Sequence, residues 1–66
     1  IVKKKRQAEI LRIISANEVE TQEMLLNLLK QKGYDVTQAT VSRDINELNI
    51  EKTVSSNGVN CYANAE

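Results

Sequence analysis

The hydrophobic residues over most of the chain recur with the period of an amphipathic helix. The first stripe, bounded by charged positions, predicts a helix over about residues 4–16. Its members are Ile10, Ile13 and Ile14, with Ala8 and Leu11 beside them. The two ends of the chain, before about Lys5 and after about Ala63, lack a comparable pattern, so we expect them to be loose.

A second helical stripe follows a short segment around Val19, which we expect to be extended. Thr21 is a favourable N-cap residue, and Glu23 places a carboxylate in the first turn, where it complements the helix dipole. Gly33 follows the last turn and readily adopts the left-handed conformation that ends many helices. The residues expected to face the core are Met24, Leu25, Leu28 and Leu29.

Residues 37–48, TQATVSRDINEL, predict a third helix whose two faces differ strongly in character. Val41, Ile45 and Leu48 recur at positions i, i+4 and i+7, so they face a core. Thr37 can cap this helix with its hydroxyl group. The opposite face and its flanks are short, polar and rich in hydrogen-bonding groups: Gln38, Ala39, Thr40, Ser42, Arg43, Asn46 and Glu47.

The second and third predicted helices are joined by only four residues, 33–36. A short turn containing glycine is what a helix-turn-helix requires, because it forces the two helices to cross steeply. We expect Tyr34 and Val36 to fill the corner between the helices. The third helix would then stand out on one side of the domain.

Apolar positions alternate in the last part of the chain, and this period of two is typical of strands. The dipeptide Asn57-Gly58 separates two such runs and predicts a β-hairpin with a type I′ turn, because both residues tolerate positive φ. The cross-strand pairs expected from this turn are Val54 with Cys61 and Thr53 with Tyr62.

An isolated hairpin is marginally stable in water, so this one should pack its apolar face on the helices. Ile50, Val54 and Cys61 are the residues expected on that face. Three helices followed by a hairpin predict an α+β, mainly α, winged helix-turn-helix fold. Residues 1–66 are long enough for one domain with a small core.

The exposed side of the third helix has the residue types that contact nucleic acids. Threonine, glutamine, serine and asparagine bind phosphates and base edges, and Arg43 can bind guanine O6 and N7 through two parallel hydrogen bonds. Glu47, four residues after Arg43, is an alternative partner for its guanidinium group. The candidate DNA-binding residues of this helix are Thr37, Gln38, Ala39, Thr40, Ser42, Arg43 and Asn46.

The charge balance gives a mixed indication of the partner. The net charge is zero and the pI is about 6.5, whereas nucleic-acid-binding domains are usually basic. Residues 1–12, however, hold five basic side chains against Glu9 alone. This end is either a solvated tail or an arm that contacts phosphates, and its candidate contacts are Lys3, Lys4 and Lys5.

Other classes of function find little support in the composition. With one cysteine, Cys61, and no histidine, neither an internal disulfide nor an ordinary zinc site can form. We expect no catalytic residues and no cofactor in this chain. No apolar run reaches membrane-spanning length, so we expect a cytoplasmic protein without a membrane partner. The start at Ile1 rather than Met indicates a piece of a longer protein.

The whole chain resembles the N-terminal domain of the bacterial arginine repressors. The resemblance rests on residues 19–22, on Gly33 and above all on residues 36–45, VTQATVSRDI. It implies that the third helix enters the major groove of double-stranded operator DNA while the hairpin, or wing, reaches the flanking backbone or minor groove. It also implies that Ser42 and Arg43 make much of the contact, with Gln38 at the start of the helix.

The resemblance further implies that the full-length protein represses arginine biosynthesis, activates arginine catabolism, or does both. L-arginine would be its co-regulator and a homo-hexamer its assembly, both through a second domain that is absent here. We therefore expect this fragment to be a monomer. The chain departs from the family at the turn of the wing, residues 55–59, which is uncharged. Lys52 and Asn57 remain the candidate DNA contacts of the wing. The wing either contacts phosphates through hydroxyl and backbone N–H groups or serves mainly as structure.

A different class of function is a winged-helix domain that binds another protein, which would suit the neutral net charge. Such a surface would be expected to expose aromatic residues, methionine or leucine on the third helix. Ala39, Ser42, Arg43 and Asn46 do not fit that expectation.

Overall fold

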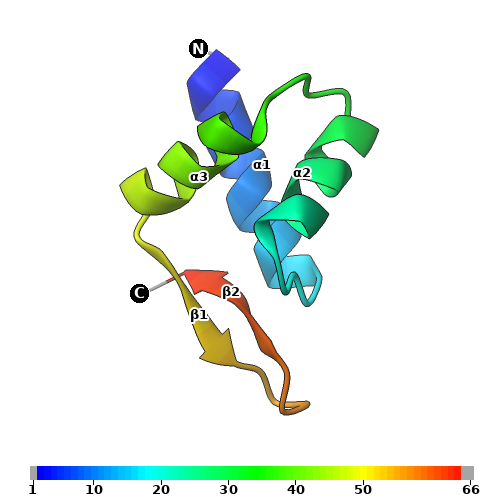
Figure 1. Ribbon diagram of the computed structural model, residues 1–66, viewed down its shortest axis with the longest axis vertical. Coiled ribbons are helices and arrows are strands. Elements are labelled where there is room, and N and C mark those ends of the chain that lie inside the picture. Colours follow the sequence, from blue (N-terminus) through cyan, green and yellow to red (C-terminus); the bar gives the residue numbers. More distant parts are fainter. Residues whose placement is uncertain (1, 65–66) are drawn as a thin grey trace.

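The computed structural model describes residues 2–64 and shows three helices followed by an antiparallel hairpin in that part of the chain (Figure 1). The elements are α1 (Val2–Ala16), α2 (Gln22–Gln31), α3 (Gln38–Glu47), β1 (Ile50–Val54) and β2 (Asn60–Asn64). The hairpin projects from one end of the helical cluster (Figure 1). This arrangement confirms the predicted winged helix-turn-helix fold.

The start of α1 lies earlier in the sequence than expected. Residues 2–4 are helical, so the prediction of a loose end before about Lys5 is wrong for them. β2 likewise continues one residue beyond Ala63. Residues 1, 65 and 66, which the same prediction also covered, lie outside the described part of the chain.

Both predicted N-caps are confirmed by their hydrogen bonds. The hydroxyl group of Thr21 accepts from the backbone N–H of Met24 over 3.1 Å, and that of Thr37 accepts from Thr40 over 3.3 Å. Each bond satisfies an amide that the first turn of a helix leaves without a partner. At the other end of α2, Gly33 has a φ of +94° and turns the chain toward α3.

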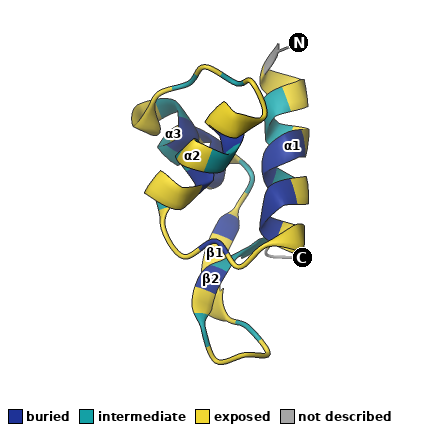
Figure 2. Ribbon diagram, turned by 90° about the vertical axis from the view of Figure 1, so that its right-hand side faces the viewer, coloured by how far each residue is buried: buried dark blue, intermediate teal, exposed yellow. Residues whose placement is uncertain are grey.

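The core lies between the three helices and the base of the hairpin, where Figure 2 shows buried residues on the inner sides of these elements. Its buried members are aliphatic: Ile10, Ile13, Ile14, Val19, Leu25, Leu29, Val41, Ile45 and Ile50. Tyr34 and Val36 pack against this core at the turn between α2 and α3, as predicted. Met24 does not, because its side chain is 39% exposed and lies about 100° around α2 from Leu25.

The hairpin pairs in a different register from the predicted one. Thr53 pairs with Cys61 and Lys52 with Tyr62, so each residue of β1 is shifted by one position relative to β2. The backbone N–H of Gly58 donates to Ser55 O over 2.9 Å and Gly58 has a φ of +79°. These features describe a three-residue loop with glycine in the left-handed position, not a two-residue type I′ turn.

The shifted register changes which residues of the hairpin are buried. Ile50 and Cys61 are both buried, but the pairing of Cys61 with Thr53 puts them on opposite faces of the hairpin, so the predicted shared face is wrong. Val54 is 62% exposed, so its predicted place on the helices is also wrong. Val54 lies at the far end of β1, where the hairpin has already left the helical cluster (Figure 2). At the base, the backbone N–H of Tyr62 donates to Val19 O over 2.8 Å and ties β2 to the segment between α1 and α2.

Candidate nucleic-acid interface

The outward face of α3 is polar and accessible. Burial of Val41 and Ile45 fixes which side of the helix faces the core, and the opposite side faces outward. The exposed candidates are Thr37, Gln38, Ala39, Arg43 and Asn46, and the half-buried ones are Thr40 and Ser42. In the described part of the chain the exposed large hydrophobic residues are Met24 and Val54, neither of them on α3. This helix therefore lacks the apolar face that a protein-binding helix would present.

Arg43 is exposed and makes no ion pair or hydrogen bond with any residue that the structure describes. Glu47, the alternative partner of Arg43, is instead bound by side chains of α1. Glu47 accepts a hydrogen bond from Gln7 over 3.1 Å and lies 2.8 Å from the ammonium group of Lys3. The guanidinium group of Arg43 is consequently available for a ligand.

Ala39 lies one helical turn before Arg43 on the same face. Its methyl side chain is the smallest on that face, so a ligand can approach the backbone of α3 closely there. Thr37 has a local role instead: besides capping the helix, its hydroxyl group lies 3.2 Å from that of Thr40. These two hydroxyl groups lie at the N-terminus of α3, where free backbone amides favour an anion.

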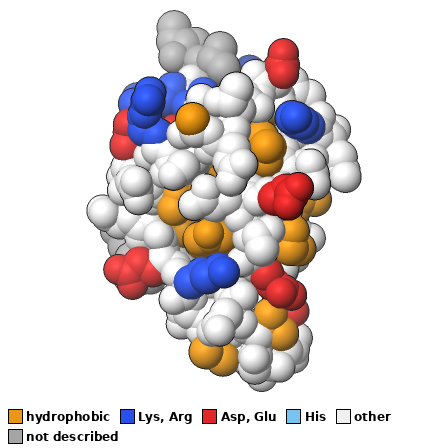
Figure 3. Space-filling view, viewed as in Figure 1, with side chains coloured by type: hydrophobic (Ala, Val, Ile, Leu, Met, Phe, Trp, Pro, Cys, Tyr) orange, Lys and Arg blue, Asp and Glu red, His pale blue; other side chains and the backbone are white. Residues whose placement is uncertain are grey.

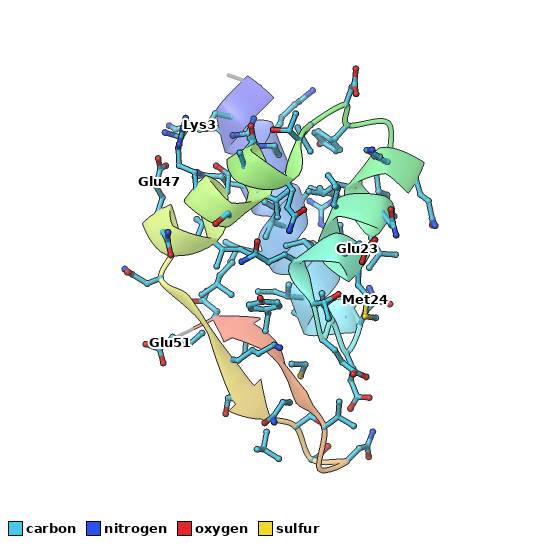
Figure 4. All side chains as sticks on the ribbon, viewed as in Figure 1. Lys3, Glu23, Met24, Glu47 and Glu51 are labelled. Atoms are coloured by element: carbon cyan, nitrogen blue, oxygen red, sulfur yellow. The ribbon has the colours of Figure 1, made fainter. Side chains whose placement is uncertain are left out.

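The basic residues of α1 lie on an ordered helix and several are paired. Lys3 and Glu47 point toward one another from α1 and α3 (Figure 4). Hydrogen bonds from Lys3 and Gln7 lower the pKa of Glu47 below its ordinary value. Lys4 and Lys5 are exposed and form no ion pair with any described residue, so they remain the free cations of this cluster.

Arg6 follows Lys3, Lys4 and Lys5 in the sequence, but its side chain binds the buried residue Asp44. Its guanidinium group donates to Asp44 through Nε to Oδ2 and through Nη2 to Oδ1, the second over 3.0 Å. Gln7 Nε2 adds a third hydrogen bond to Asp44 Oδ1 over 3.1 Å. Burial alone would raise the pKa of Asp44, but the hydrogen bonds from Arg6 and Gln7 and the charges of Arg6 and Lys3 hold it below its ordinary value.

Asp44 was not predicted as an important residue, although the helical wheel contains a signal. Three positions after Val41, it lies about 60° from that residue and borders the apolar stripe. A carboxylate at the edge of a core needs a basic partner. The sequence could not show which of the basic residues supplies it.

The tip of the wing is bonded to the segment between α1 and α2. Ser55 Oγ and Asn57 Nδ2 both donate to Glu18 Oε2, over 2.8 Å and 3.0 Å. Lys52, the other candidate contact in the wing, is exposed and its ammonium group lies 5.5 Å from the centre of the Tyr62 ring. That distance is within the range of a cation–π interaction.

The surface around these candidates does not form a continuous basic patch. On the face shown in Figure 3, basic side chains lie in separate groups with acidic side chains between them. Among the described residues no group of three potential metal ligands comes together. In residues 2–64 no helix is both long and apolar enough to cross a membrane.

Residues 1–66 match a family model described as "Arginine repressor, DNA binding domain". The arginine repressor of Bacillus subtilis is 52% identical over 61 residues, which are 92% of this chain and 41% of that protein. That of Clostridium novyi is 55% identical over 62 residues, 94% of this chain and 41% of that protein. That of Clostridium kluyveri is 57% identical over 58 residues, 88% of this chain and 39% of that protein. The chain thus spans about two fifths of the length of these relatives.

Proposed function

Since the chain belongs to the arginine repressor family through that family's DNA-binding domain, we propose that residues 1–66 form one domain that binds operator DNA with α3 in the major groove. The observation that supports this most directly is the outward face of α3. It is polar, has a small residue at Ala39, and presents Arg43 without a partner among the described residues. An arginine in this state can bind guanine without first breaking an ion pair.

In the proposed complex Arg43 binds the O6 and N7 atoms of a guanine through both arms of its guanidinium group. Gln38, Ser42 and Asn46 contact neighbouring base edges, and the N-terminus of α3 with Thr37 and Thr40 contacts a phosphate. Lys4 and Lys5 on α1 supply further phosphate contacts that do not depend on base sequence.

A full-length regulator of this family with this domain would couple DNA binding to L-arginine, repressing arginine biosynthesis, activating catabolism, or both. The name arginine repressor, which these relatives have, supports the link to arginine and to repression. We assign L-arginine binding and a homo-hexameric assembly to the part of these relatives that the chain does not cover, so the domain of residues 1–66 is expected to be a monomer without a cofactor. A regulator of bacterial chromosomal genes would act in the cytoplasm.

The test is a binding titration of the domain on a duplex with an arginine operator and on a scrambled duplex of the same length. The wild type should prefer the operator. Arg43→Ala and Arg43→Lys should both reduce that preference, because lysine keeps the charge but loses the planar fork. A bidentate contact of this kind gives roughly 1–3 kcal/mol of discrimination, which is about 5- to 150-fold.

Lys30→Ala, which removes an exposed cation from α2, is the matched control and should leave the preference unchanged. Equal binding of the wild type to both duplexes would refute the proposed function. Full preference in Arg43→Lys would assign Arg43 to a phosphate and leave base recognition to Gln38, Ser42 or Asn46.

A further inference from the structure

Polar side chains of α1 link this helix to α3, in addition to the shared apolar core. The backbones of α1 and α2, and those of α2 and α3, meet more closely than do the backbones of α1 and α3. Arg6 and Gln7 span the distance and both end on Asp44, which is only 1% exposed. All the polar atoms of this buried carboxylate are satisfied.

Stability alone does not explain a buried ion pair at this position. Removing two charges from water costs about as much as their attraction returns, and apolar residues of similar size are often as stabilising or more so. Ile45 and Val41 beside Asp44 already supply apolar packing on the same side of α3. What the pair supplies in addition is geometry, because a two-armed guanidinium–carboxylate contact is satisfied in one orientation only.

That geometry acts directly on the DNA-binding face. Asp44 is adjacent to Arg43 in the same helix, and the two side chains leave it about 100° apart, one buried and one exposed. Fixing Asp44 therefore fixes the rotation of α3 about its axis and the direction in which Arg43 leaves it. Recognition groups need to be held within about 0.5 Å and 10–20° of the productive geometry, so a small rotation of α3 would be sufficient to misplace Arg43.

We propose that Asp44, held by Arg6 and Gln7, is a positioning residue that sets the orientation of α3 and thereby the preference of the domain for its operator. This inference rests on the proposed function. It assigns to Arg6 a role in specificity that does not involve contact with DNA.

The experiment replaces the pair by apolar residues of similar size in the double variant Arg6→Met/Asp44→Leu. This change removes one positive and one negative charge, so the net charge and the attraction to DNA in general stay the same. The domain should remain folded by circular dichroism and unfold at a temperature close to that of the wild type. We expect its preference for operator over scrambled duplex to fall about tenfold, with binding to scrambled duplex changed less than about twofold.

The matched control is Glu9→Leu/Arg12→Met. These residues also form an ion pair, with Arg12 Nη1 3.0 Å from Glu9 Oε1, but both lie within α1 and the side chain of neither forms a hydrogen bond or an ion pair with α3. The control should keep the operator preference of the wild type. If Asp44 has a purely structural role, the Arg6→Met/Asp44→Leu variant should also keep the operator preference of the wild type. That outcome would overturn the proposal.

Arg6→Lys provides a second test should the apolar double variant fail to fold. Lysine keeps the charge beside Asp44 but cannot make the two-armed contact, so the operator preference should fall several-fold while binding to scrambled duplex is retained. Undiminished preference in Arg6→Lys would also overturn the proposal. The proposed function is refuted by a different outcome, namely a wild-type domain that shows no preference for the operator.

Discussion

The side-chain amide of Asn57 donates a hydrogen bond to Glu18 over 3.0 Å, joining the tip of the wing to the segment that precedes α2. Ser55 donates to the same carboxylate oxygen. Two of the polar side chains that the wing could offer to a phosphate are therefore already bonded to a carboxylate. A phosphate could take them only by leaving Glu18 unpaired beside another negative charge, which is unfavourable.

This arrangement predicts that Asn57 contributes to DNA affinity only when Glu18 is absent. Asn57→Ala alone should change the affinity less than about twofold. In the Glu18→Ala background, where the amide is free for a phosphate, Asn57→Ala should weaken DNA binding several-fold more. A double-mutant cycle on one duplex measures this coupling.

Glu20→Ala is the control for charge, because Glu20 is exposed in the same segment and forms no ion pair with a described residue. It should show no coupling to Asn57. A loss of affinity in Asn57→Ala alone as large as in the Glu18→Ala background would mean that the wing tip already contacts DNA in the wild type.

Removing the carboxylate of Glu47 should strengthen binding to every duplex. Glu47→Gln releases Lys3 from its ion pair and lets the ammonium group contact a phosphate. The slope of log affinity against log salt should then steepen by roughly 0.9, the value for one added phosphate contact. Operator preference should not change.

Glu23→Gln, which neutralises an exposed acid on α2 (Figure 4), is the comparison for this titration and should leave the slope as it is. If the slope of Glu47→Gln also equals that of the wild type, Lys3 does not contact a phosphate after its release from Glu47. The phosphate contacts of this cluster would then come from Lys4 and Lys5.

The free energy of unfolding should fall in acid because of Asp44. The pKa of this carboxyl group is lower in the folded protein than in the unfolded chain, where it is about 3.9. The unfolded state therefore binds more protons as the pH falls below about 4, and the stabilisation by ionised Asp44, complete near pH 7, is lost. Urea titrations at several pH values from 7 to 3 measure this loss. In Asp44→Asn the decrease should be smaller, and an unchanged pH dependence would assign it to other carboxyl groups.

Leu25 and Met24 are neighbours in α2 with opposite environments, so they give a direct test of the core. Leu25 is fully buried, and Leu25→Ala should lower the free energy of unfolding by about 2–5 kcal/mol. Met24 is partly exposed, and Met24→Ala should cost less than about 1 kcal/mol. Thermal unfolding distinguishes the two, and equal losses would contradict the assignment of α2's buried face.

Local sequence signals predicted the helices well because the relevant chemistry lies within a few residues. Thr21 and Thr37 bond amides three positions away, and Gly33 ends α2 through its own backbone conformation. The apolar stripe of α3 also fixed which residues face outward. The candidate face could therefore be identified from sequence alone, although its contacts with DNA remain a prediction.

Features that depend on distant residues were not predictable in the same way. The Asn57-Gly58 dipeptide indicated a hairpin but not its register, because asparagine and glycine fit both a two-residue turn and a three-residue loop. Arg6 was grouped with the exposed lysines because its partner Asp44 lies 38 positions away in the sequence. Only the packing of α1 across α3 shows that this cation is internal.

Two residues, Leu48 and Asn49, separate α3 from β1. Asn49 has a φ of +56°, a left-handed conformation that asparagine adopts more readily than most residues. So short a junction leaves the wing no independent hinge, and the separation between α3 and the wing is a fixed length. The hydrogen bonds to Glu18 leave Lys52 as the exposed cation of the wing, and a contact of Lys52 with a phosphate requires that length to match the span from the major groove to the flanking backbone. We therefore expect the domain to discriminate among operators by groove width as well as by base identity, including at base pairs that no side chain touches.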